Sequence, residues 1–312
     1  MTEVFIHPLA LCESTSVGSG THVAPFSHIE PGAKIGENCS IQDHVYIGSN
    51  VVVGDRVIIQ QGARVRSNVV IEDDVFIGAN VSFSETPNVL EWRNSSGTGV
   101  TYIRQRAKIF DNTTVFSGVT IGSDANIGAG TVVQRDIQPK AIAEGNPARI
   151  VGYVHTNPVS RENKYVIDEF QRIQKTAVRG VTLHSLRNVL DMRGNLTVAE
   201  FGADVPFDAK RFFLINDVPS VESRGEHAHY RCAQFLIAVK GSLHVVADDG
   251  ARREEFVLDK PTLGLFLPPM VWGIQYRYSF DAVLLVIASE HYDSGDYIRN
   301  YDDFLDLARS RE

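Results

Sequence analysis

Two histidines in the second half of the sequence have the spacing that proton transfer between neighbouring atoms requires. His227 and His229 stand two positions apart in the run Arg224-Gly-Glu-His-Ala-His229. On a β-strand, residues two apart point to the same face of the sheet. Imidazole titrates near neutral pH, so a same-face pair in a protein interior can take a proton from one atom and return it to another. The pair is therefore the leading candidate for an acid–base site.

A His-x-His pair on a barrel strand is also half of a metal site in cupins, where a glutamate and a third histidine follow. Here Gln234 stands at the glutamate position, and the later segment Gly264-Leu-Phe-Leu-Pro-Pro-Met-Val-Trp-Gly273 contains no histidine. Two neutral imidazoles alone hold a divalent ion poorly. We therefore expect no metal, and the alternative that both histidines are ordinary core residues stays open.

The composition indicates a folded chain with enough apolar residues for two cores. Of its 312 residues, 43% are apolar and 22% are charged, and the formal net charge is −8. At roughly 150 residues per domain, this length predicts two domains. The negative charge argues against nucleic acid and anionic membranes as partners.

Cys12, Cys39 and Cys232 are too few and too scattered for a disulfide framework. Without a membrane-spanning run or a recognisable signal peptide, the chain is expected in the cytoplasm.

The first half repeats with a period of six residues. Thirteen successive positions, each six after the last, are apolar: Leu11, Val17, Val23, Ile29, Ile35, Ile41, Ile47, Val53, Ile59, Val65, Ile71, Ile77 and Phe83. This period fits neither an α-helix nor an alternating strand. It fits a parallel β-helix, in which each hexad is one short strand plus a corner and three hexads complete a coil. The register breaks after Phe83 and resumes at Ile103, which predicts an extruded loop at residues 84–102.

The second half changes to short β runs separated by turns. Such runs lie at 235–239, 243–246, 255–258, 263–267 and 283–288. This spacing predicts an antiparallel barrel or flattened sandwich. The polar stretch around Pro158 is typical of a linker, and Ile167, Phe170 and Ile173 have the spacing of a short helix. We therefore expect an all-β chain with domains at 1–155 and 179–312, joined by a linker and docking helix at 156–178.

The first half resembles the left-handed β-helix acyltransferases, in particular those that N-acetylate amino sugars carried on nucleotides. The resemblance lies in residues 71–83, in Ile127-Gly-Ala-Gly-Thr-Val-Val133 and in residues 145–154. It implies a trimer with acetyl-CoA in the groove between adjacent β-helices. The residues that it implies for acetyl-CoA binding are Gly128, Ala129, Gly130, Arg135, Lys140 and Arg149. The candidates for binding the amino sugar near the loop are Glu85, Asp111 and Asn112.

The second half resembles the cupin-fold 3,4-ketoisomerases that act on dTDP-4-keto-6-deoxy sugars. The matching motifs include Asp191-Met-Arg-Gly-Asn-Leu196, Arg224-Gly-Glu-His-Ala-His229, Asp248-Asp-Gly250 and Asp296-Tyr-Ile-Arg-Asn-Tyr-Asp-Asp-Phe304. Such an enzyme removes the C3 proton beside the C4 ketone and returns a proton to C4. We assign His229 as the base and His227 as its partner, in an order that stays open. The residues assigned to dTDP-sugar binding are Arg224, Gln234, Trp272 and Tyr276.

Together the two resemblances predict a bifunctional enzyme of surface-polysaccharide synthesis, such as that of O-antigen. Its substrates would be dTDP-4-keto-6-deoxyglucose for the isomerase, and acetyl-CoA with a dTDP-3-amino-3,6-dideoxyhexose for the N-acetyltransferase. Three alternatives stay open: a β-helix that only trimerises the chain, a cupin that is a 3,5-epimerase, and a catalytically silent sugar-nucleotide binding protein. A three-fold axis through the β-helix and a two-fold axis through the barrel edges predict a hexamer.

Overall fold

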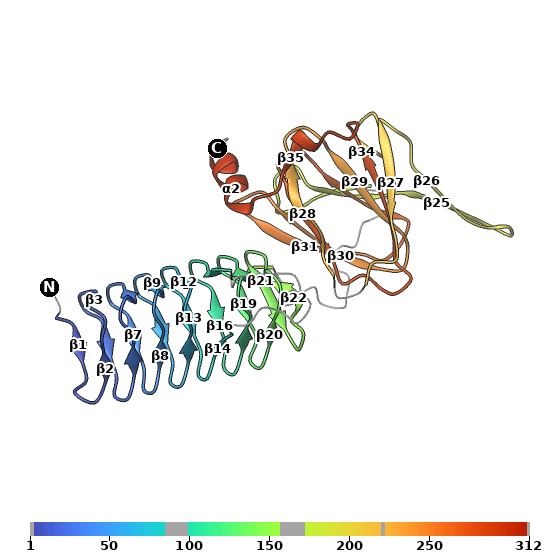
Figure 1. The fold of residues 1–312 in the computed structure, drawn as a ribbon. Helices are drawn as coiled ribbons and strands as arrows, with labels where there is room; N and C mark the ends of the chain where they lie inside the picture. Colours follow the sequence, from blue (N-terminus) through green and yellow to red (C-terminus); the bar gives the residue numbers. More distant parts are fainter. Residues whose placement is uncertain (1–2, 85–98, 157–171, 220–221, 311–312) are drawn as a thin grey trace. The chain divides into compact units, whose positions relative to one another are not determined.

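The computed structural model describes residues 3–84, 99–156, 172–219 and 222–310. The chain divides into two compact units, Met1–Val154 and His155–Glu312, which Figure 1 shows as a ribbon. The predicted extruded loop falls largely on residues 85–98, and most of the predicted linker and docking helix on 157–171, outside the described residues. Ile173, one of the three residues at helical spacing, begins a strand instead. Among the described residues, no helix is long and apolar enough to cross a bilayer.

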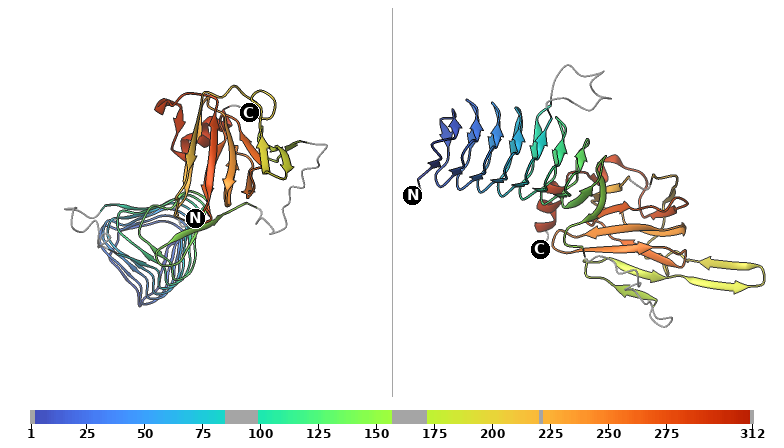
Figure 2. Two further views of the ribbon diagram at one scale, coloured as in Figure 1. Left: turned by 90° about the vertical axis from the view of Figure 1, so that its right-hand side faces the viewer. Right: turned by 90° about the horizontal axis from the view of Figure 1, so that it is seen from below.

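The first unit is a parallel β-helix of very short strands, with a three-sided cross-section (Figure 2, left). One face carries β1 (Phe5–Ile6), β4 (His22–Val23), β7 (Ser40–Ile41), β10 (Ile58–Ile59), β13 (Phe76–Ile77), β16 (Lys108–Ile109), β19 (Asn126–Ile127), β21 (Ala141–Glu144) and β22 (Arg149–Tyr153). The second face carries β2 (Leu11–Cys12), β5 (His28–Ile29), β8 (Tyr46–Ile47), β11 (Arg64–Val65), β14 (Ser82–Phe83), β17 (Thr114–Val115) and β20 (Val132–Val133). The third carries β3 (Ser16–Val17), β6 (Lys34–Ile35), β9 (Val52–Val53), β12 (Val69–Ile71), β15 (Thr101–Ile103) and β18 (Thr120–Ile121).

The six-residue period produces this helix because every sixth side chain points inward. Strands pair in parallel with partners 18 residues away, as in His22↔Ser40, so three hexads complete one coil as predicted. The repeated aliphatic side chains stack in the interior, and Ile29, Ile47 and Ile59 have no exposed surface. Between β12 and β15 the partners are 32 residues apart, as in Val69↔Thr101. The insertion is therefore real, and the strand after it begins at Thr101, two residues before the predicted Ile103.

The second unit has two antiparallel sheets facing each other, as the β runs predicted. One sheet has the order β23 (Ile173–Lys175), β24 (Thr182–Ser185), β32 (Leu263–Leu267), β29 (Gln234–Lys240), β34 (Val283–Ala288) and β27 (Arg211–Ile215). The other has the order β31 (Arg253–Leu258), β30 (Leu243–Asp248), β33 (Trp272–Tyr276), β28 (Arg224–His229) and β35 (Tyr297–Ile298). A separate hairpin of β25 (Arg187–Asp191) and β26 (Gly194–Val198) extends away from the sheets (Figure 1).

The core of the second unit lies between the two sheets and leaves one end for polar groups. Leu236, Val245, Phe256, Leu265 and Val286 fill the interior and are almost completely buried. Helix α2 (Tyr301–Arg309) begins at Asn300, whose side chain accepts hydrogen bonds from two backbone amides of the first turn. Such a cap fixes the start of a helix. The preceding strand β35 pairs with β28 and directly follows the 3-10 helix η1 (Ser294–Asp296).

Candidate active site

The two histidines lie on β28, next to an irregularity that aims their side chains. The pairing of β28 with β33 shifts between Gly225 and His227, and Glu226 has a φ of 53°. Such a bulge redirects the side chains that follow it. Beyond the bulge, His229 pairs with Tyr297 on β35. The two imidazole rings lie with their centroids 4.9 Å apart, so the structure brings the predicted pair together on one face.

His229 is held at both ring nitrogens. Its Nδ1 lies 3.2 Å from Oδ2 of Asp296, and its Nε2 lies 3.1 Å from the side-chain nitrogen of Gln234. The Asp296 carboxylate also accepts hydrogen bonds from the backbone amides of Arg231 and Cys232, at 2.9 and 3.1 Å. A carboxylate fixed in this way accepts the Nδ1 proton of His229 and thereby leaves the Nε2 lone pair to accept from Gln234. This network assigns the tautomer.

Both histidines are neutral at physiological pH. Burial, followed by the neighbouring His227, lowers the pKa of His229 to about 4, although Asp296 acts in the opposite direction. Burial also lowers the pKa of His227, and the positive charge of Arg299 adds to this effect. Nδ1 of His227 lies 2.6 Å from the carbonyl oxygen of Gly225 and donates to it, which leaves its Nε2 as the lone-pair nitrogen. The site therefore holds two neutral imidazoles, each with one basic nitrogen.

A small cavity opens in front of the two rings. Besides the histidines, it is lined by Cys232, Gln234, Leu267, Pro268, Val271, Gly273 and Gln275. The ring of Tyr297 packs against both imidazoles, with centroids 4.8 Å from His227 and 4.3 Å from His229. The guanidinium of Arg299 lies 4.4 Å from the centroid of the same tyrosine ring. The cavity thus combines the two imidazoles with the polar side chains of Gln234 and Gln275 and with apolar walls at Leu267, Pro268 and Val271.

The donor set does not fit the divalent metal of a typical cupin. Beside Nε2 of His229 lies the side-chain amide of Gln234, which donates a hydrogen bond to that atom. A neutral amide also replaces the carboxylate that would balance the charge of the ion. We therefore route no chemical step through a metal at this position.

Comparisons with known proteins agree with the division into two units. A family model described as WxcM-like, C-terminal matches residues 179–309. A bacterial transferase hexapeptide model matches residues 14–49 and 50–84, and a model described as the hexapeptide repeat of succinyl-transferase matches residues 111–135. A TDP-4-oxo-6-deoxy-α-D-glucose-3,4-oxoisomerase from Aneurinibacillus thermoaerophilus is 41% identical over 120 residues, 38% of this chain and 86% of the relative. A dTDP-3-amino-3,6-dideoxy-α-D-galactopyranose 3-N-acetyltransferase from the same organism is 49% identical over 150 residues, 48% of this chain and 78% of the relative.

The chain belongs to both families. It is a sugar 3,4-ketoisomerase joined to an N-acetyltransferase, as the two resemblances in the sequence predicted. A solved structure similar to the ketoisomerase unit is a 3,4-ketoisomerase from Helicobacter canadensis, 35% identical, covering 42% of this chain and 98% of that chain with a TM-score of 0.41.

Two of the side chains assigned to nucleotide-sugar binding lie away from the histidines of the ketoisomerase unit. Gly273 and Gln275 of β33 line the cavity, so the alternating Trp272 and Tyr276 point to the opposite face of the sheet. Trp272 packs on Tyr301 and Phe304 of α2, at 5.1 and 5.5 Å between centroids. The hydroxyl of Tyr276 donates to the buried carboxylate of Glu255. Arg224, in contrast, is exposed at the start of β28 and pairs with Gln275, which lines the histidine cavity.

The ketoisomerase site also contains residues to which sequence patterns alone assigned no role. Asp296 and Tyr297 contact the histidines from a segment almost 70 positions further along the chain. Arg211 on β27 is near enough for its charge to lower the pKa of His229 further, and its buried Nε has no hydrogen-bond partner among the described residues. The motif that begins at Asp296 could have indicated Asp296 and Tyr297 as site residues. No local spacing could have indicated Arg211.

In the acetyltransferase unit, two of the residues proposed to bind the amino sugar make hydrogen bonds at corners of the β-helix. Oδ1 of Asp111 accepts a hydrogen bond from the backbone amide of Ala79 at 2.9 Å. Asp55 makes a bond of the same kind to the amide of Glu37 at 2.7 Å, at another corner of the β-helix. Asn112 has a φ of 58° and accepts from the Asn80 side chain. Glu85, the third proposed ligand, lies outside the described residues.

The predicted acetyl-CoA residues of one chain fall at different corners of the acetyltransferase coil. Gly128–Gly130 form the turn after β19, and Ala129 and Gly130 are exposed there. Arg135 is exposed after β20, at the next corner. Lys140 precedes β21, at the third corner, and exposed Arg149 begins β22. The described part of a single chain therefore does not gather all six residues into one groove.

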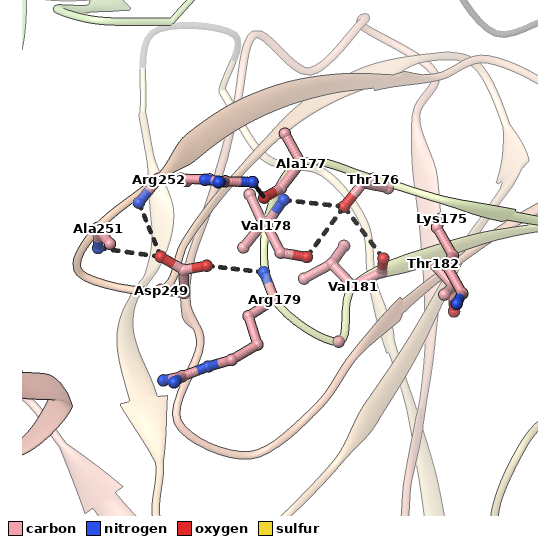
Figure 3. Close-up of a pocket in the computed structure, with 11 residues that line it drawn as sticks. Lys175, Thr176, Ala177, Val178, Arg179, Val181, Thr182, Asp249, Ala251 and Arg252 are labelled. Atoms are coloured by element: carbon pink, nitrogen blue, oxygen red, sulfur yellow. Dashed lines mark hydrogen bonds between the residues drawn. The ribbon is translucent and has the colours of Figure 1, made fainter. Parts of the chain in front are cut away.

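The ketoisomerase unit has a larger pocket away from the histidines, with a volume of about 600 Å³. Its walls are residues 175–182 and the turn at Asp249–Arg252 (Figure 3). Asp249 holds these walls together, because its carboxylate accepts from the backbone amides of Arg179, Ala251 and Arg252 at 2.7, 2.9 and 2.7 Å. None of the sequence-predicted site residues lines this pocket. The volume of a pocket therefore does not identify the site of the predicted proton transfer in this unit.

Proposed function

We propose that the ketoisomerase unit converts dTDP-4-keto-6-deoxyglucose into its 3-keto isomer. We further propose that the acetyltransferase unit moves the acetyl group of acetyl-CoA onto a dTDP-3-amino-3,6-dideoxyhexose. These substrates follow the names of the two curated relatives. The observation that carries the first assignment is the neutral His229 ring, clamped between Asp296 and Gln234 beside a second neutral imidazole.

The isomerisation exchanges two protons between neighbouring positions of the sugar. The proton on C3 is removed and a proton is added to C4, while the hydroxyl proton on O3 is lost and one is gained at O4. The C4 ketone makes the C3 proton acidic, and the electron pair of the C3–H bond forms an enediol. The carbonyl then forms at C3 as C4 takes up its proton. Two neutral imidazoles can carry these protons near neutral pH.

We assign the carbon-bound proton to His229. As this ring becomes an imidazolium, Asp296 stabilises its positive charge through Nδ1, much as a carboxylate supports a catalytic histidine in hydrolases. His227, 4.9 Å away, carries the second proton on Nε2. The reverse order of the two histidines remains the alternative. Arg211 stabilises negative charge on the enediolate oxygen, and exposed Arg224 binds the diphosphate.

We propose that the ketoisomerase unit needs no metal. Gln234 places a neutral amide where a metal site would have a carboxylate, and both histidines can exchange protons without an ion. Full activity after exhaustive chelation is the expected result. Activity that is lost on chelation and restored by one added metal would contradict this proposal.

Acetylation requires less from the protein than isomerisation. The neutral amine attacks the thioester carbon, a C–N bond forms, the C–S bond breaks, and the amine proton is lost as CoA leaves as a thiol. A neutral amine is already a good nucleophile, so positioning supplies most of the acceleration. Gly128–Gly130 would present backbone to the pantetheine arm, and Arg135, Lys140 and Arg149 would meet its phosphates.

The two activities fit separate steps of one pathway. The 3-keto product of isomerisation becomes an acceptor for acetylation only after a transamination puts an amine on C3, so a transaminase must act between the two units. We propose that the product enters a surface polysaccharide. A cytoplasmic location stays a prediction.

We propose a hexamer that combines trimers of the β-helix with dimers of the ketoisomerase unit. Strand β27 is the last strand of its sheet, and its outward side chains Phe212 and Leu214 are 70% and 54% exposed. An unpaired edge with exposed apolar side chains favours pairing with a second copy. Combined with a three-fold axis, such pairing closes at six chains.

An NMR time course with the 4-keto sugar in deuterated water tests the ketoisomerase. We expect the carbonyl signal to move from C4 to C3 and deuterium to enter at C4. Deuterium at C3 and C5 with the ketone still at C4 would indicate a 3,5-epimerase instead. For the acetyltransferase unit, release of free CoA thiol on addition of a dTDP-3-amino sugar is expected. Its absence with both 3-amino epimers would leave the β-helix as a trimerisation stem.

A further inference from the structure

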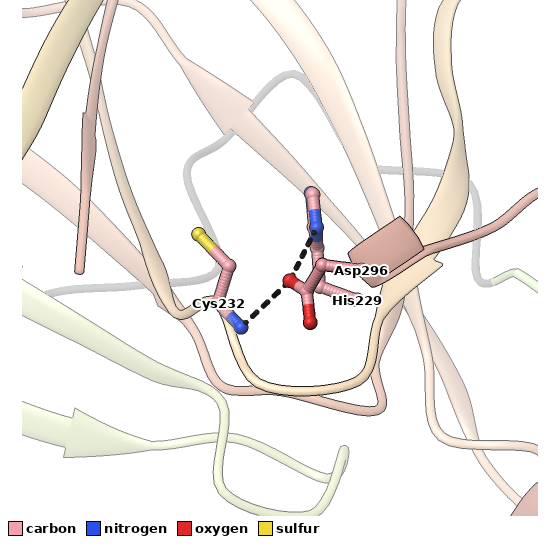
Figure 4. A group of neighbouring side chains, drawn as sticks. All are labelled: His229, Cys232 and Asp296. Atoms are coloured by element: carbon pink, nitrogen blue, oxygen red, sulfur yellow. Dashed lines mark hydrogen bonds and ion pairs between the residues drawn. The ribbon is translucent and has the colours of Figure 1, made fainter. Parts of the chain in front are cut away.

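Three side chains with different ligand atoms meet beside the ketoisomerase cavity. His229, Cys232 and Asp296 each place a nitrogen, sulfur or oxygen atom within 4.8 Å of the others (Figure 4). All three residues are buried, with 6%, 3% and 4% of their surface exposed. The proposed proton transfer uses His229 and Asp296 but gives no task to the sulfur.

Cys232 is fixed in place by its backbone and not by its thiol. Its amide donates to Oδ2 of Asp296 at 3.1 Å, which ties the turn after β28 to the carboxylate. Its Sγ makes one long hydrogen bond, at 3.4 Å to the carbonyl oxygen of Ala233. The residue lines the cavity that contains His229. A small ion that enters this cavity can therefore bind the Cys232 thiol at the cost of one hydrogen bond, the one to the carbonyl oxygen of Ala233.

We propose that His229, Cys232 and Asp296 form a zinc site, and that zinc bound there inhibits the ketoisomerase. Imidazole, thiolate and carboxylate are the ligands that zinc takes in proteins. In a tetrahedral shell with bonds of about 2.0–2.1 Å, two such ligand atoms lie about 3.4 Å apart. Nδ1 of His229 and Oδ2 of Asp296 are 3.2 Å apart, and the sulfur of Cys232 lies within 4.8 Å of a nitrogen of this imidazole and an oxygen of this carboxylate.

Zinc would inhibit because it takes the same groups that the proton transfer needs. The ion displaces the proton on Nδ1 of His229 and replaces the hydrogen bond to Asp296, while the thiol loses its proton to solvent. The imidazole then cannot become the imidazolium that Asp296 stabilises. This ligand set differs from that of a metal-dependent cupin, since it uses neither His227 nor position 234. The inhibition rests on the proposed ketoisomerase function, whereas the binding of zinc does not.

Metal binding is tested first on the full chain, without reference to activity. Metals are first removed by chelation. One sample then receives Co²⁺ as a spectroscopic substitute for zinc, and a second receives zinc, whose bound amount is measured by elemental analysis. We expect one tightly bound ion per chain and a thiolate-to-cobalt charge-transfer band. Both should be lost in Cys232→Ala and kept in Cys12→Ala and Cys39→Ala, which remove the other two cysteines. No charge-transfer band in the unaltered chain, or its loss in either control, would overturn the site.

The inhibition is tested with both activities of the same chain. Zinc should slow the conversion of the 4-keto sugar, leave acetyl transfer unchanged, and lose its effect on addition of chelator. In Cys232→Ala, the zinc concentration that halves the ketoisomerase rate should rise by at least about tenfold. Equal sensitivity of this variant, or tight binding without inhibition, would overturn the regulatory role. If the metal-free chain has no ketoisomerase activity at all, the proposed function fails, and the cobalt band still decides the zinc site.

Discussion

Nδ1 of His229 lies 3.2 Å from Oδ2 of Asp296, a residue 67 positions further along the chain. The carboxylate cannot turn away, because the backbone amides of Arg231 and Cys232 also donate to it. A fixed acceptor of this kind selects one tautomer of the imidazole and stabilises its protonated form. The contact with Asp296 leaves the lone pair of His229 on Nε2, the atom to which Gln234 donates a hydrogen bond.

Replacing this carboxylate should slow isomerisation without affecting acetylation. In Asp296→Asn the amide group can donate to Nδ1 and so favour the wrong tautomer, and it cannot balance an imidazolium. We expect the kcat for isomerisation to fall on the order of 10²-fold to 10⁴-fold. The acetyl-transfer rate of the same preparation is the control for folding. An isomerisation rate within about twofold of the unaltered chain would show that Asp296 has no part in the reaction.

The ketoisomerase should remain active at unusually low pH for a histidine base. His229 must be neutral to accept a proton, and its pKa is lowered to about 4. The neutral fraction therefore falls only as pH drops through about 4, not through about 6.5, the ordinary value for histidine. We expect kcat/KM to be level between pH 7 and about 5. Circular dichroism at each pH checks that the fold persists, and an acidic limb near 6.5 would contradict the assignment of His229.

Tyr276 should prove a stabilising residue and not a substrate ligand. Its hydroxyl donates to Glu255, on the face of the sheet opposite the histidine cavity. Tyr276→Phe removes a buried hydrogen bond to a carboxylate, which costs about 1.5–3 kcal/mol of stability. We expect lower denaturant resistance and an unchanged KM for the 4-keto sugar. A KM increase of about tenfold would place the hydroxyl in the substrate site.

Asp111 can be tested against a matched corner aspartate in the β-helix. Asn keeps the oxygen that accepts from the Ala79 amide but loses the charge that would attract a sugar ammonium. If Asp111 only completes the corner, Asp111→Asn and Asp55→Asn should have equally small effects on acetyl transfer. A KM for the amino sugar raised only in Asp111→Asn would assign the carboxylate to substrate binding.

The proposed dimer contact at β27 predicts a change of assembly. Phe212→Lys places a charge on the exposed edge strand and should reduce the hexamer to a trimer. Phe280→Lys alters a fully exposed phenylalanine in the turn after β33 and should leave the hexamer intact. Light scattering distinguishes these states, since six chains of 34.5 kDa are expected in the unaltered protein. An unaltered chain that is trimeric or monomeric at micromolar concentration would refute the hexamer.

The sequence by itself determined the repeating parts of this protein. A six-residue period permits one repeated local geometry, so the inward row from Val23 to Phe83 follows from spacing alone. The same holds for His227 and His229, because strand alternation places residues two apart on one face whatever the rest of the fold does. Family resemblance then supplied the two activities, since each half carries its own motifs.

Only the tertiary structure decided which distant residues complete the site and which predicted ones leave it. Asp296 lies beside His229 because β35, which begins at the next residue, pairs with β28, a relation that no sequence spacing encodes. Trp272 and Tyr276 lie on the other face because Gly273 and Gln275 of the same strand face the cavity. Hydrogen bonds and burial depend on what packs across a sheet, and burial is what holds the His229 pKa near 4. Local sequence patterns determine the direction of a side chain, but contacts made across the fold determine its chemistry.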